Sequence, residues 1–375
     1  MALDGILVLE DGAEFTGTLF GVKASIELIR KAAKKKDFAY GEVVFNTSMS
    51  GYQEILTDPS YYGQMICMTT PHIGNTGIND ADPESTRVWC SGFILHQLSE
   101  QPSSWRSQGS LESYLTKYEI PGIHGIDTRA LTRHIRSKGV VRGIILPMSE
   151  KAQAKNLLNE LPRFEGRDLI AEVSTREAYP WPHQKKKAKH KVVAMDFGIK
   201  SNMLRILEEM DCAVEVVPAS TSSSEILALK PDGIFLSNGP GDPSAATYAV
   251  KTVRELLGKT PVFGVCMGHQ ILALALGAKT YKLKFGHRGG NQPVIDLGTQ
   301  KVEISSHNHG YAVELASIPP SVEVTHINLN DKTVEGIRSK EYEAFSVQYH
   351  PEACPGPHDS IMLFRKFIEK LKPKT

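Results

Sequence analysis

From Lys191 onwards, the chain alternates between short apolar runs and segments with the spacing of an amphipathic helix. The apolar runs are KVVAMD, AVEVVP, GIFLSN and PVFGV. After the first run, apolar residues recur at positions i, i+3, i+4 and i+7 of one helix face, namely Met203, Ile206, Leu207 and Met210. Strands joined by helix-length connections form βαβ units and parallel sheets. The sequence therefore predicts an α/β fold in which a doubly wound, mainly parallel sheet carries helices on both faces.

The first 150 residues follow a different pattern, in which β-like runs alternate with turn residues. The runs are rich in Val, Ile, Phe and Thr, and they include ILVLED, EFTGTLF and EVVFN. One exception is IDTRALTRHIRSKG, which predicts a helix with Asp127 as its N-cap and Gly139 at its end. We therefore expect a smaller, β-rich α+β domain at 1–150. A polar segment at 151–190 is expected to connect it to a second domain at 191–375.

The composition and charge of the chain argue against several classes of protein. The 375 residues carry 43 basic and 42 acidic side chains, so the net charge of +1 gives no field for binding a nucleic acid or an anionic membrane. The longest apolar stretch, at 271–278, is well short of the roughly 20 residues of a membrane helix. The five cysteines include no C-x-x-C pair, which argues against a disulfide framework and a cysteine-rich zinc site. We expect a cytoplasmic protein that binds neither nucleic acid nor membranes.

The sharpest motif is PVFGVCMGHQ, where an apolar strand stops at Cys266 and a helix-forming run begins. Gly264 and Gly268 flank this cysteine, as in the strand-to-helix elbow that carries a nucleophile in other enzymes. The helix N-terminus supplies free N–H groups and partial positive charge, which favour a thiolate and a developing oxyanion. An isolated cysteine is more often a buried structural residue. The complete elbow nevertheless favours a catalytic nucleophile.

A cysteine nucleophile needs a base, and the base needs an orienting group. The C-terminal run FSVQYHPE supplies His350 at a strand end and Glu352 two residues later. We expect His350 to lie beside Cys266 and Glu352 to hold the imidazole in position. A lone histidine at a strand end is usually structural, but the adjoining Pro-Glu and the upstream elbow weigh against that interpretation.

Another strand end carries SNGPGDP, which contains Gly239 and Gly241. A G-x-G pair alone is a weak signal, and the dinucleotide fingerprint is not met because Pro243 and Ser244 follow. NAD binding is therefore disfavoured, and the bare backbone can instead offer N–H donors to an oxyanion. The sequence also lacks the G-x-x-x-x-G-K-[ST] loop, so we expect no ATP site in this chain.

Two histidines alternate along a later β-like run. On a strand, His307 and His309 would share a face and could hold a metal ion. No acidic or cysteine ligand stands at a recognisable spacing from them in the sequence, so we expect no metal site.

Three motifs of the C-terminal half occur together in a fixed order. They are GPGDP, GVCMGHQ and YHPE, and they resemble the class I, or triad, glutamine amidotransferases, which release ammonia from glutamine. The N-terminal half distinguishes among the members of that class. Its segments LEDGAEFTGTLFG, GEVVFNTSMSGYQEILTDPSYYGQ, PHIGNTGIND and IDTRALTRHIRSKG resemble the small subunit of carbamoyl-phosphate synthase. The resemblance covers essentially the whole chain.

The resemblance assigns roles to individual residues. Cys266 would attack the glutamine carboxamide, His350 would act as acid and base, and Glu352 would orient the histidine. The backbone N–H groups of Gly239 and Met267 would form the oxyanion hole. The other positions around the bound glutamine would be Ser48, Gly241, Gln270, Asn308, Gly310 and Tyr311. Because Ser48 belongs to the N-terminal domain, the resemblance implies a site at the domain interface.

The resemblance also implies a division of labour between two chains. This chain would hydrolyse L-glutamine through a γ-glutamyl thioester without a cofactor, and a large ATP-grasp subunit would hold ATP and Mg²⁺ and receive the ammonia through a tunnel. The carbamoyl phosphate formed there would serve arginine or pyrimidine synthesis. One alternative is a free-standing γ-glutamyl hydrolase or cysteine peptidase with the same triad. Another is a catalytically inactive binding or regulatory module, for which the complete triad gives no support.

Overall fold

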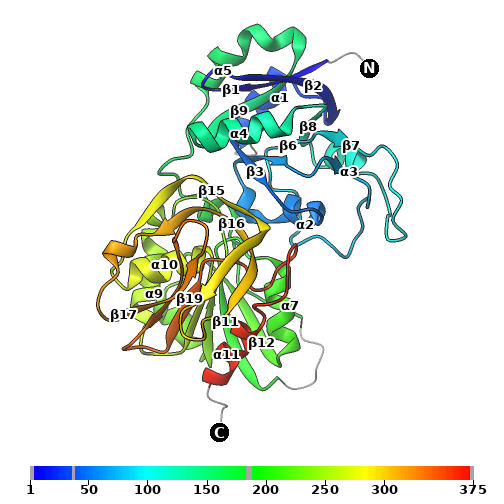
Figure 1. The fold of residues 1–375 in the computed structure, drawn as a ribbon. Coiled ribbons are helices and arrows are strands. Elements are labelled where there is room, and N and C mark those ends of the chain that lie inside the picture. Colours follow the sequence, from blue (N-terminus) through cyan, green and yellow to red (C-terminus); the bar gives the residue numbers. More distant parts are fainter. Residues whose placement is uncertain (1–3, 36–38, 183–187, 372–375) are drawn as a thin grey trace. The chain divides into compact units, whose positions relative to one another are not determined.

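The computed structural model describes residues 4–35, 39–182 and 188–371 (Figure 1). The chain divides into two compact units, Met1–Phe164 and Glu165–Thr375. The division falls inside 151–190, the segment that the sequence analysis expects to join two domains. Across the described ranges, no helix is both long enough and apolar enough to cross a membrane.

In the first unit, the described strands close a seven-stranded barrel. In their order around the barrel, they are β1 (Gly5–Leu9), β2 (Glu14–Gly21), β8 (Pro121–His124), β6 (Gly92–Ile94), β4 (Gln64–Met68), β3 (Tyr40–Asn46) and β9 (Val141–Pro147). Two short strands pair separately, β5 (His72–Ile73) and β7 (Gln97–Leu98). The helices are α1 (Ile26–Lys35), α2 (Tyr52–Thr57), α3 (Leu111–Lys117), α4 (Thr128–Lys138) and α5 (Ala154–Glu160), with 3-10 turns η1 (Pro59–Tyr61) and η2 (Met148–Gln153). The unit is rich in β-structure, as the sequence predicts.

Helix α4 shows how the local sequence sets these boundaries. The Asp127 carboxylate accepts a hydrogen bond from the Ala130 N–H (2.8 Å), which caps the first turn. Gly139 ends the helix with a φ of 102°, a conformation that glycine adopts without a steric penalty. Leu131 and Ile135 are fully buried one turn apart on the inner face. The predicted helix and both of its ends are confirmed.

The second unit is built on one large sheet formed by its described strands. The parallel part has the order β12 (Cys212–Pro218), β11 (His190–Asp196), β13 (Gly233–Leu236), β14 (Val262–Val265) and β19 (Ala344–Val347). The remaining strands are β10 (Tyr179–Pro180), β15 (Thr280–Asp296), β16 (Val302–Val313), β17 (Val322–Asn328) and β18 (Val334–Ser339). The helices are α6 (Ile170–Val173), α7 (Ser201–Glu209), α8 (Ser223–Ala228), α9 (Thr247–Leu256), α10 (Met267–Ala275) and α11 (Met362–Lys370), with 3-10 turns η3 (Pro243–Ala245) and η4 (Leu315–Ser317).

The sheet is mixed, so the expectation of a mainly parallel sheet needs correction. β15 pairs antiparallel with β16, β17 pairs antiparallel with β18, and β18 pairs antiparallel with β19. Parallel neighbours need a crossover connection, which is usually a helix. Between α10 and β19, the described chain forms the short turn η4 and no α-helix, so its strands return as antiparallel neighbours. The alternation that predicts parallel strands therefore holds up to α10 and not beyond it.

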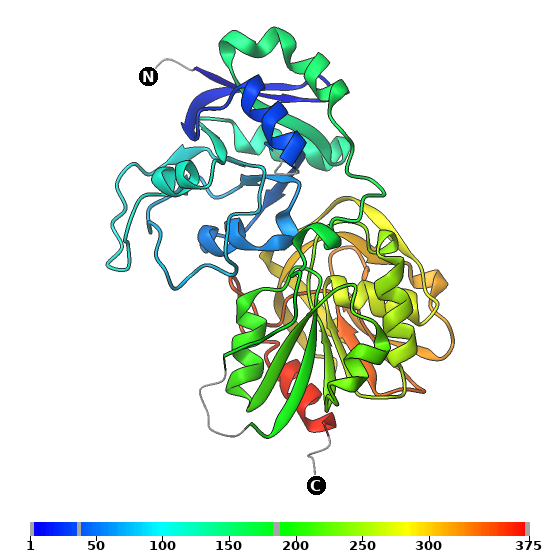
Figure 2. The same cartoon turned by 180° about the vertical axis from the view of Figure 1, so that it is seen from behind.

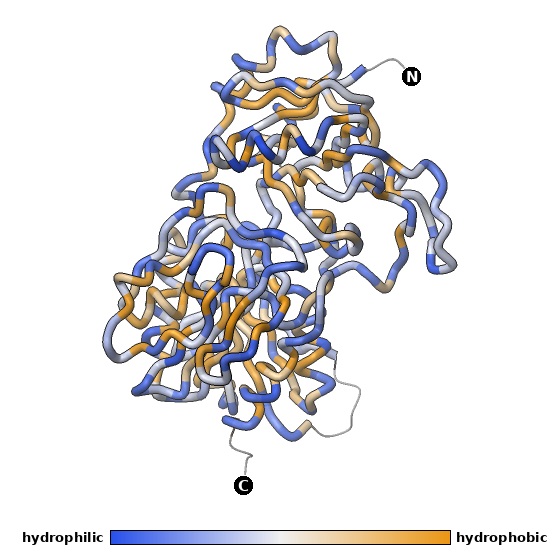
Figure 3. The backbone as a smooth tube through the Cα atoms, viewed as in Figure 1, coloured by the Kyte–Doolittle hydropathy of each residue, from blue (hydrophilic) through white to orange (hydrophobic). Residues whose placement is uncertain are grey.

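Alternate residues of the parallel strands belong to two separate apolar clusters. On β11, Val192 and Ala194 pack in one cluster with residues of α7 and α11, whereas Val193 and Met195 pack in the other with residues of α8, α9 and α10. Successive side chains of a strand point to opposite faces, so these helices cover both faces of the parallel strands. Figure 2 shows these strands from behind, and Figure 3 shows the apolar residues along them. The carboxyl ends of parallel strands meet at one edge, which is where such sheets hold ligands.

Candidate active site

The candidate nucleophile stands at the junction of β14 and α10. β14 ends at Val265 and α10 begins at Met267, so Cys266 alone forms the turn. Its backbone angles, φ 55° and ψ −103°, are a conformation that a residue with a side chain rarely adopts. Its N–H donates to the Val347 carbonyl oxygen (2.9 Å), which ties the turn to β19. Backbone strain of this kind persists where the surrounding structure enforces it, and it is concentrated at functional sites.

Three glycines around this turn are required by the space available. A Cβ atom on Gly264 would lie 2.6 Å from the Gly268 carbonyl oxygen, and one on Gly268 would lie 2.2 Å from the Leu236 carbonyl oxygen. At the neighbouring strand end, a Cβ atom on Gly239 would lie 2.1 Å from the Phe197 carbonyl oxygen. All three obstacles are backbone atoms, which cannot rotate away as a side chain can. Gly268 therefore lets α10 pack directly onto the end of β13, Gly264 lets α10 begin close to β14, and Gly239 lets its own loop pass close to Phe197.

We expect Gly268→Ala to lower the free energy of unfolding by about 3 kcal/mol, because the added methyl group pushes α10 away from the β13 backbone. Urea unfolding of both proteins measures the difference. Gly109→Ala is the matched control, since a Cβ atom on Gly109 would meet side-chain carbons of Ile78 at 3.5 Å, an ordinary contact. Equal destabilisation by the two substitutions would contradict this steric account.

The candidate base and its orienting group follow β19. The His350 N–H donates to the Ser306 carbonyl oxygen (2.8 Å), which fixes the backbone just beyond the strand. The His350 ring Nδ1 lies 2.7 Å from Glu352 Oε1, so the ring donates this hydrogen bond to the carboxylate. The side chains of Cys266, His350 and Glu352 are all buried. The Nδ1–H bond leaves Nε2 as the nitrogen that can exchange a proton with another group.

The electrostatics of this pair depend on their buried neighbours. Burial alone would lower the pKa of His350, but the charges of Glu352 and Cys266, together with the hydrogen bond to Glu352, raise the pKa to about 10. Burial would raise the pKa of Glu352, but the charges of Lys200 and His350 lower the pKa to about 2. A carboxylate and an imidazolium are therefore the favoured forms near neutral pH. Cysteine attacks as a thiolate, so a nucleophilic role for Cys266 requires a neighbouring base such as His350.

Lys200 is a member of this array that the sequence analysis missed. Its Nζ lies 2.8 Å from Glu352 Oε1, the atom that also accepts from His350, and it donates to the Ala353 carbonyl oxygen as well. The lysine side chain is only 3% exposed, and the glutamate is fully buried. One feature could have drawn attention to this lysine. Lys200 is the N-cap of α7, where a positive charge interacts unfavourably with the helix dipole. In the fold, the carboxylate of Glu352 offsets that unfavourable interaction.

The thiol lies between the base and the strand β16. Cys266 Sγ donates to the Asn308 carbonyl oxygen (3.6 Å), and the same group is close enough to His350 to influence its pKa. The buried His350 Nε2 makes no hydrogen bond of normal geometry with the described residues. Rotation of the thiol from Asn308 towards Nε2 would complete the contact. His350 and Glu352 are thus in contact, and the assignment of Cys266, His350 and Glu352 as a catalytic triad stays a prediction.

Residues that the resemblance assigns to glutamine binding lie on the adjacent elements. Gln270 on α10 is buried, and its Nε2 donates to the Tyr311 carbonyl oxygen (2.8 Å) and to Gln348 Oε1 (2.9 Å). Asn308, Gly310 and Tyr311 all belong to β16. The amide of Gln270 and the thiol of Cys266 therefore both bond to the backbone of β16, which links α10 to that strand.

The other assigned residues are divided between the two units. Met267 is the first residue of α10, and Gly239 follows the end of β13, onto which α10 packs. Gly241 has a φ of 83°, which favours glycine, and a Cβ atom there would lie 3.2 Å from Leu169. Ser48 lies in the first unit, where its N–H donates to Asn46 Oδ1 (2.7 Å). Its place in a glutamine site stays a prediction.

Comparisons with known proteins match both units. The family model "Glutamine amidotransferase class-I" matches residues 193–370, and "Carbamoyl-phosphate synthase small chain, CPSase domain" matches residues 7–145. The carbamoyl phosphate synthase small chain of Syntrophotalea carbinolica is 50% identical over 382 residues, which cover 99% of this chain and 98% of that one. The small chain of Chlorobaculum tepidum is 50% identical over 374 residues, with 99% and 98% covered. The chloroplastic small chain of Oryza sativa subsp. japonica is 48% identical over 383 residues, with 98% and 82% covered.

These matches agree with the motifs and with the geometry. The amidotransferase match contains the elbow at Cys266 and the pair His350 and Glu352, and the other match covers most of the barrel unit. Class I amidotransferases use no cofactor in the small chain. The chain belongs to the small chains of carbamoyl-phosphate synthase, and it is an enzyme, the glutamine-hydrolysing subunit, whose C-terminal region is a class I glutamine amidotransferase.

Proposed function

We propose that this chain converts L-glutamine to glutamate and ammonia through a γ-glutamyl thioester on Cys266. The thiolate attacks the side-chain carbonyl carbon, and the tetrahedral intermediate carries the negative charge on its oxygen. The imidazolium of His350 donates its Nε2 proton to the departing nitrogen, which leaves as ammonia. Neutral His350 then takes a proton from water, the hydroxide displaces Cys266, and glutamate is released. Each step uses this chain's own side chains, the substrate and water.

The observation that carries this proposal is the buried array of Lys200, Glu352 and His350 beside Cys266. The 2.8 Å contact of Lys200 with Glu352 holds a carboxylate, and the 2.7 Å contact of Glu352 with His350 holds the imidazole. Ionisation of the carboxylate strengthens both contacts, and protonation of the imidazole strengthens the contact between Glu352 and His350. The array therefore stabilises the imidazolium that forms when the thiol loses its proton.

The substrate-binding part of the proposal uses backbone groups near the sulfur. The N–H groups of Gly239 and Met267 would donate to the oxyanion, because Met267 begins α10 and Gly239 follows the end of β13, the strand on which α10 packs. Gln270, Asn308, Gly310, Tyr311, Gly241 and Ser48 would surround the rest of the glutamine. The link between Gln270 and β16 supports the placement of that strand along the substrate.

The proposal extends to a partner chain. The relatives are named small chains, which implies a large chain. We propose that this partner is an ATP-grasp subunit that holds ATP and Mg²⁺ and receives the ammonia through an internal tunnel, because transfer inside protein avoids protonation and dilution in water. The complex would be cytoplasmic. Residues 191–375 would act as the doubly wound amidotransferase domain, preceded by the domain at 1–150 and the connecting segment at 151–190.

An assay of this chain in complex with its large chain tests the proposed substrate against the runner-up. The complex is given glutamine in one reaction and a γ-glutamyl dipeptide in another, and released glutamate is measured. We expect rapid glutamate release from glutamine alone, with its nitrogen recovered in carbamoyl phosphate. Faster hydrolysis of the dipeptide than of glutamine would favour the γ-glutamyl hydrolase or peptidase interpretation.

A further inference from the structure

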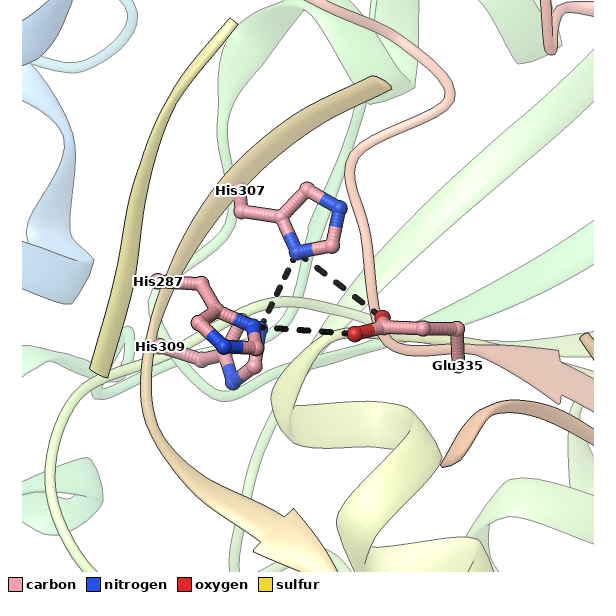
Figure 4. A group of neighbouring side chains, drawn as sticks. All are labelled: His287, His307, His309 and Glu335. Carbon is pink, nitrogen blue, oxygen red and sulfur yellow. Dashed lines mark hydrogen bonds and ion pairs between the residues drawn. The ribbon is translucent and has the colours of Figure 1, made fainter. Parts of the chain in front are cut away.

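A second group of buried polar side chains lies in the antiparallel part of the sheet. It comprises His287 on β15, His307 and His309 on β16, and Glu335 on β18, and we call it the His₃Glu cluster (Figure 4). All four residues are buried, and one ligand-type atom from each lies within 4.8 Å of the others. The spacing of the sequence alone predicts no metal at His307 and His309, because no acidic or cysteine ligand stands at a recognisable distance along the chain. The neighbouring strands supply two further ligands.

The spacing of the inward-facing atoms suits a tetrahedral ion. His307 Nδ1 lies 3.1 Å from His309 Nε2 and 3.8 Å from Glu335 Oε2. His287 Nδ1 lies 3.7 Å from Glu335 Oε1. A tetrahedral Zn²⁺ with bonds of about 2.0–2.1 Å separates its ligand atoms by about 3.3 Å. The distance of 3.1 Å between the two histidine nitrogens is slightly shorter than this value, and the two distances to Glu335, 3.7 and 3.8 Å, are slightly longer.

In two of the imidazoles, the ring nitrogen that points away from the centre of the cluster donates a hydrogen bond. His287 Nε2 donates to Asp331 Oδ2 (2.7 Å), and His309 Nδ1 donates to the Tyr311 carbonyl oxygen (2.8 Å). Metal-bound histidines almost always donate their second N–H to a carboxylate, a backbone carbonyl or water, which fixes the tautomer and the ring orientation. With its proton on Nδ1, neutral His309 presents a lone pair on Nε2, towards the centre of the cluster.

The third imidazole, that of His307, also forms a hydrogen bond through the nitrogen that points away from the cluster. His307 Nε2 lies 2.8 Å from Ser305 Oγ, and this hydroxyl donates its proton to the Gln292 carbonyl oxygen (3.0 Å). The hydroxyl can therefore only accept from His307 Nε2, so neutral His307 carries its lone pair on Nδ1. That lone pair faces the lone pair of His309 Nε2 across 3.1 Å. Two lone pairs at this distance repel unless a proton or a metal ion lies between them.

The remaining inward-facing atoms have ion-pair contacts within the cluster but no hydrogen bond from the described part of the chain. Glu335 Oε2 and His287 Nδ1 are buried, and neither makes a hydrogen bond with the described residues. Buried polar atoms in native proteins are nearly always paired, so orphaned atoms aimed at one point indicate a missing ligand. A single cation at the centre of the cluster would satisfy all four residues.

We infer that the His₃Glu cluster binds one Zn²⁺ ion through His287, His307, His309 and Glu335. Imidazole and carboxylate ligands in tetrahedral spacing favour zinc over Mg²⁺ and Ca²⁺, which prefer more oxygen ligands. With four protein ligands the site is closed, as structural zinc sites are, so the ion takes no step in glutamine hydrolysis. It joins β15, β16 and β18, and thereby holds the strand that carries Asn308 and the Tyr311 carbonyl.

Metal content of the purified full-length chain tests this inference. After incubation with zinc and gel filtration, we expect about one zinc ion per chain by elemental mass spectrometry. Glu335→Gln and His287→Gln should each lower the retained zinc at least about tenfold, since each removes one ligand. The matched control is His326→Gln, which replaces a buried histidine on β17, outside the His₃Glu cluster.

Two further measurements on the unaltered chain keep the test independent of variant folding. Cobalt added to the metal-free chain should give the strong visible absorption of a tetrahedral site, and a chelator should lower the thermal midpoint of the zinc-loaded chain. An unaltered chain that retains no zinc, gives no such absorption and has the same midpoint with and without chelator would overturn the inference. So would a zinc content that falls equally in His326→Gln and Glu335→Gln.

Discussion

Cys266→Ser should lower glutamine-dependent carbamoyl phosphate synthesis by about 10⁴-fold or more, because the triad acts as a unit and loses its nucleophile. A serine hydroxyl is far harder to ionise than a thiol, so His350 cannot generate a comparable nucleophile in its place. Synthesis from added ammonia should be retained, since the proposed chemistry with ammonia occurs on the large chain. The measurement is the rate of carbamoyl phosphate formation by the complex with each nitrogen source.

Cys212→Ser is the matched control for that substitution. Cys212 is a buried, free cysteine on β12 of the same unit, away from the elbow. We expect its glutamine-dependent rate per folded molecule to be within about twofold of the unaltered complex. Retention of glutamine-dependent synthesis in Cys266→Ser would rule out Cys266 as the nucleophile.

Lys200→Met should destabilise the chain by about 3–5 kcal/mol, because it removes one member of a buried ion pair and leaves the Glu352 carboxylate without it. The pKa of Glu352 should rise, its hold on the His350 imidazolium should weaken, and glutamine turnover should fall by up to about 10²-fold. Urea unfolding at pH 7 measures the change in the free energy of unfolding. The rate of glutamine hydrolysis by the complex measures the fall in turnover. Ammonia-dependent synthesis should again be retained.

The pH dependence separates this charge effect from a simple loss of packing. In the folded chain the pKa of Glu352 is lowered from 4.5 to about 2. A lowered carboxyl pKa contributes stability that is present above pH 4.5 and is lost as the pH falls towards 2. The stability gap between the unaltered chain and Lys200→Met should therefore be widest above pH 4.5 and narrow below it. A gap that stays constant down to pH 3 would contradict the electrostatic explanation.

The same substitution at an exposed pair provides the control. Lys282 Nζ lies 3.3 Å from Glu165 Oε1, with 33% and 64% of the two side chains exposed. Exposed ion pairs contribute little because water screens them, so we expect Lys282→Met to change the free energy of unfolding by less than about 1 kcal/mol. A comparable loss in Lys282→Met and Lys200→Met would mean that burial of the pair is not the cause.

The elbow could be predicted from the sequence because its constraints are local. Gly264, Cys266 and Gly268 lie within one short motif, and the clash that requires glycine at position 264 is with the Gly268 carbonyl oxygen inside that motif. His350 and Glu352 are two residues apart, so their 2.7 Å contact depends on one turn of chain. The helix α4 is likewise set by its own cap residues. Features of this kind need no knowledge of which strands become neighbours.

The features that sequence analysis missed depend on contacts between distant segments. Lys200 is 152 residues from Glu352 in the chain, and only the fold brings the segments that follow β11 and β19 together for that ion pair. Glu335 joins the histidines of β16 because β18 lies beside that strand. The closed barrel and the antiparallel half of the sheet could not be predicted for the same reason, since the spacing of apolar residues does not encode the order of the strands.

Mass spectrometry of the complex, quenched during glutamine turnover, tests the central claim most directly. We predict that the peptide containing Cys266 gains the mass of one glutamyl group, that the adduct is removed by alkaline hydroxylamine as a thioester should be, and that Cys266→Ser shows no adduct. Glutamate release at the full rate with no adduct on Cys266, or with the adduct on another cysteine, would contradict the proposed mechanism.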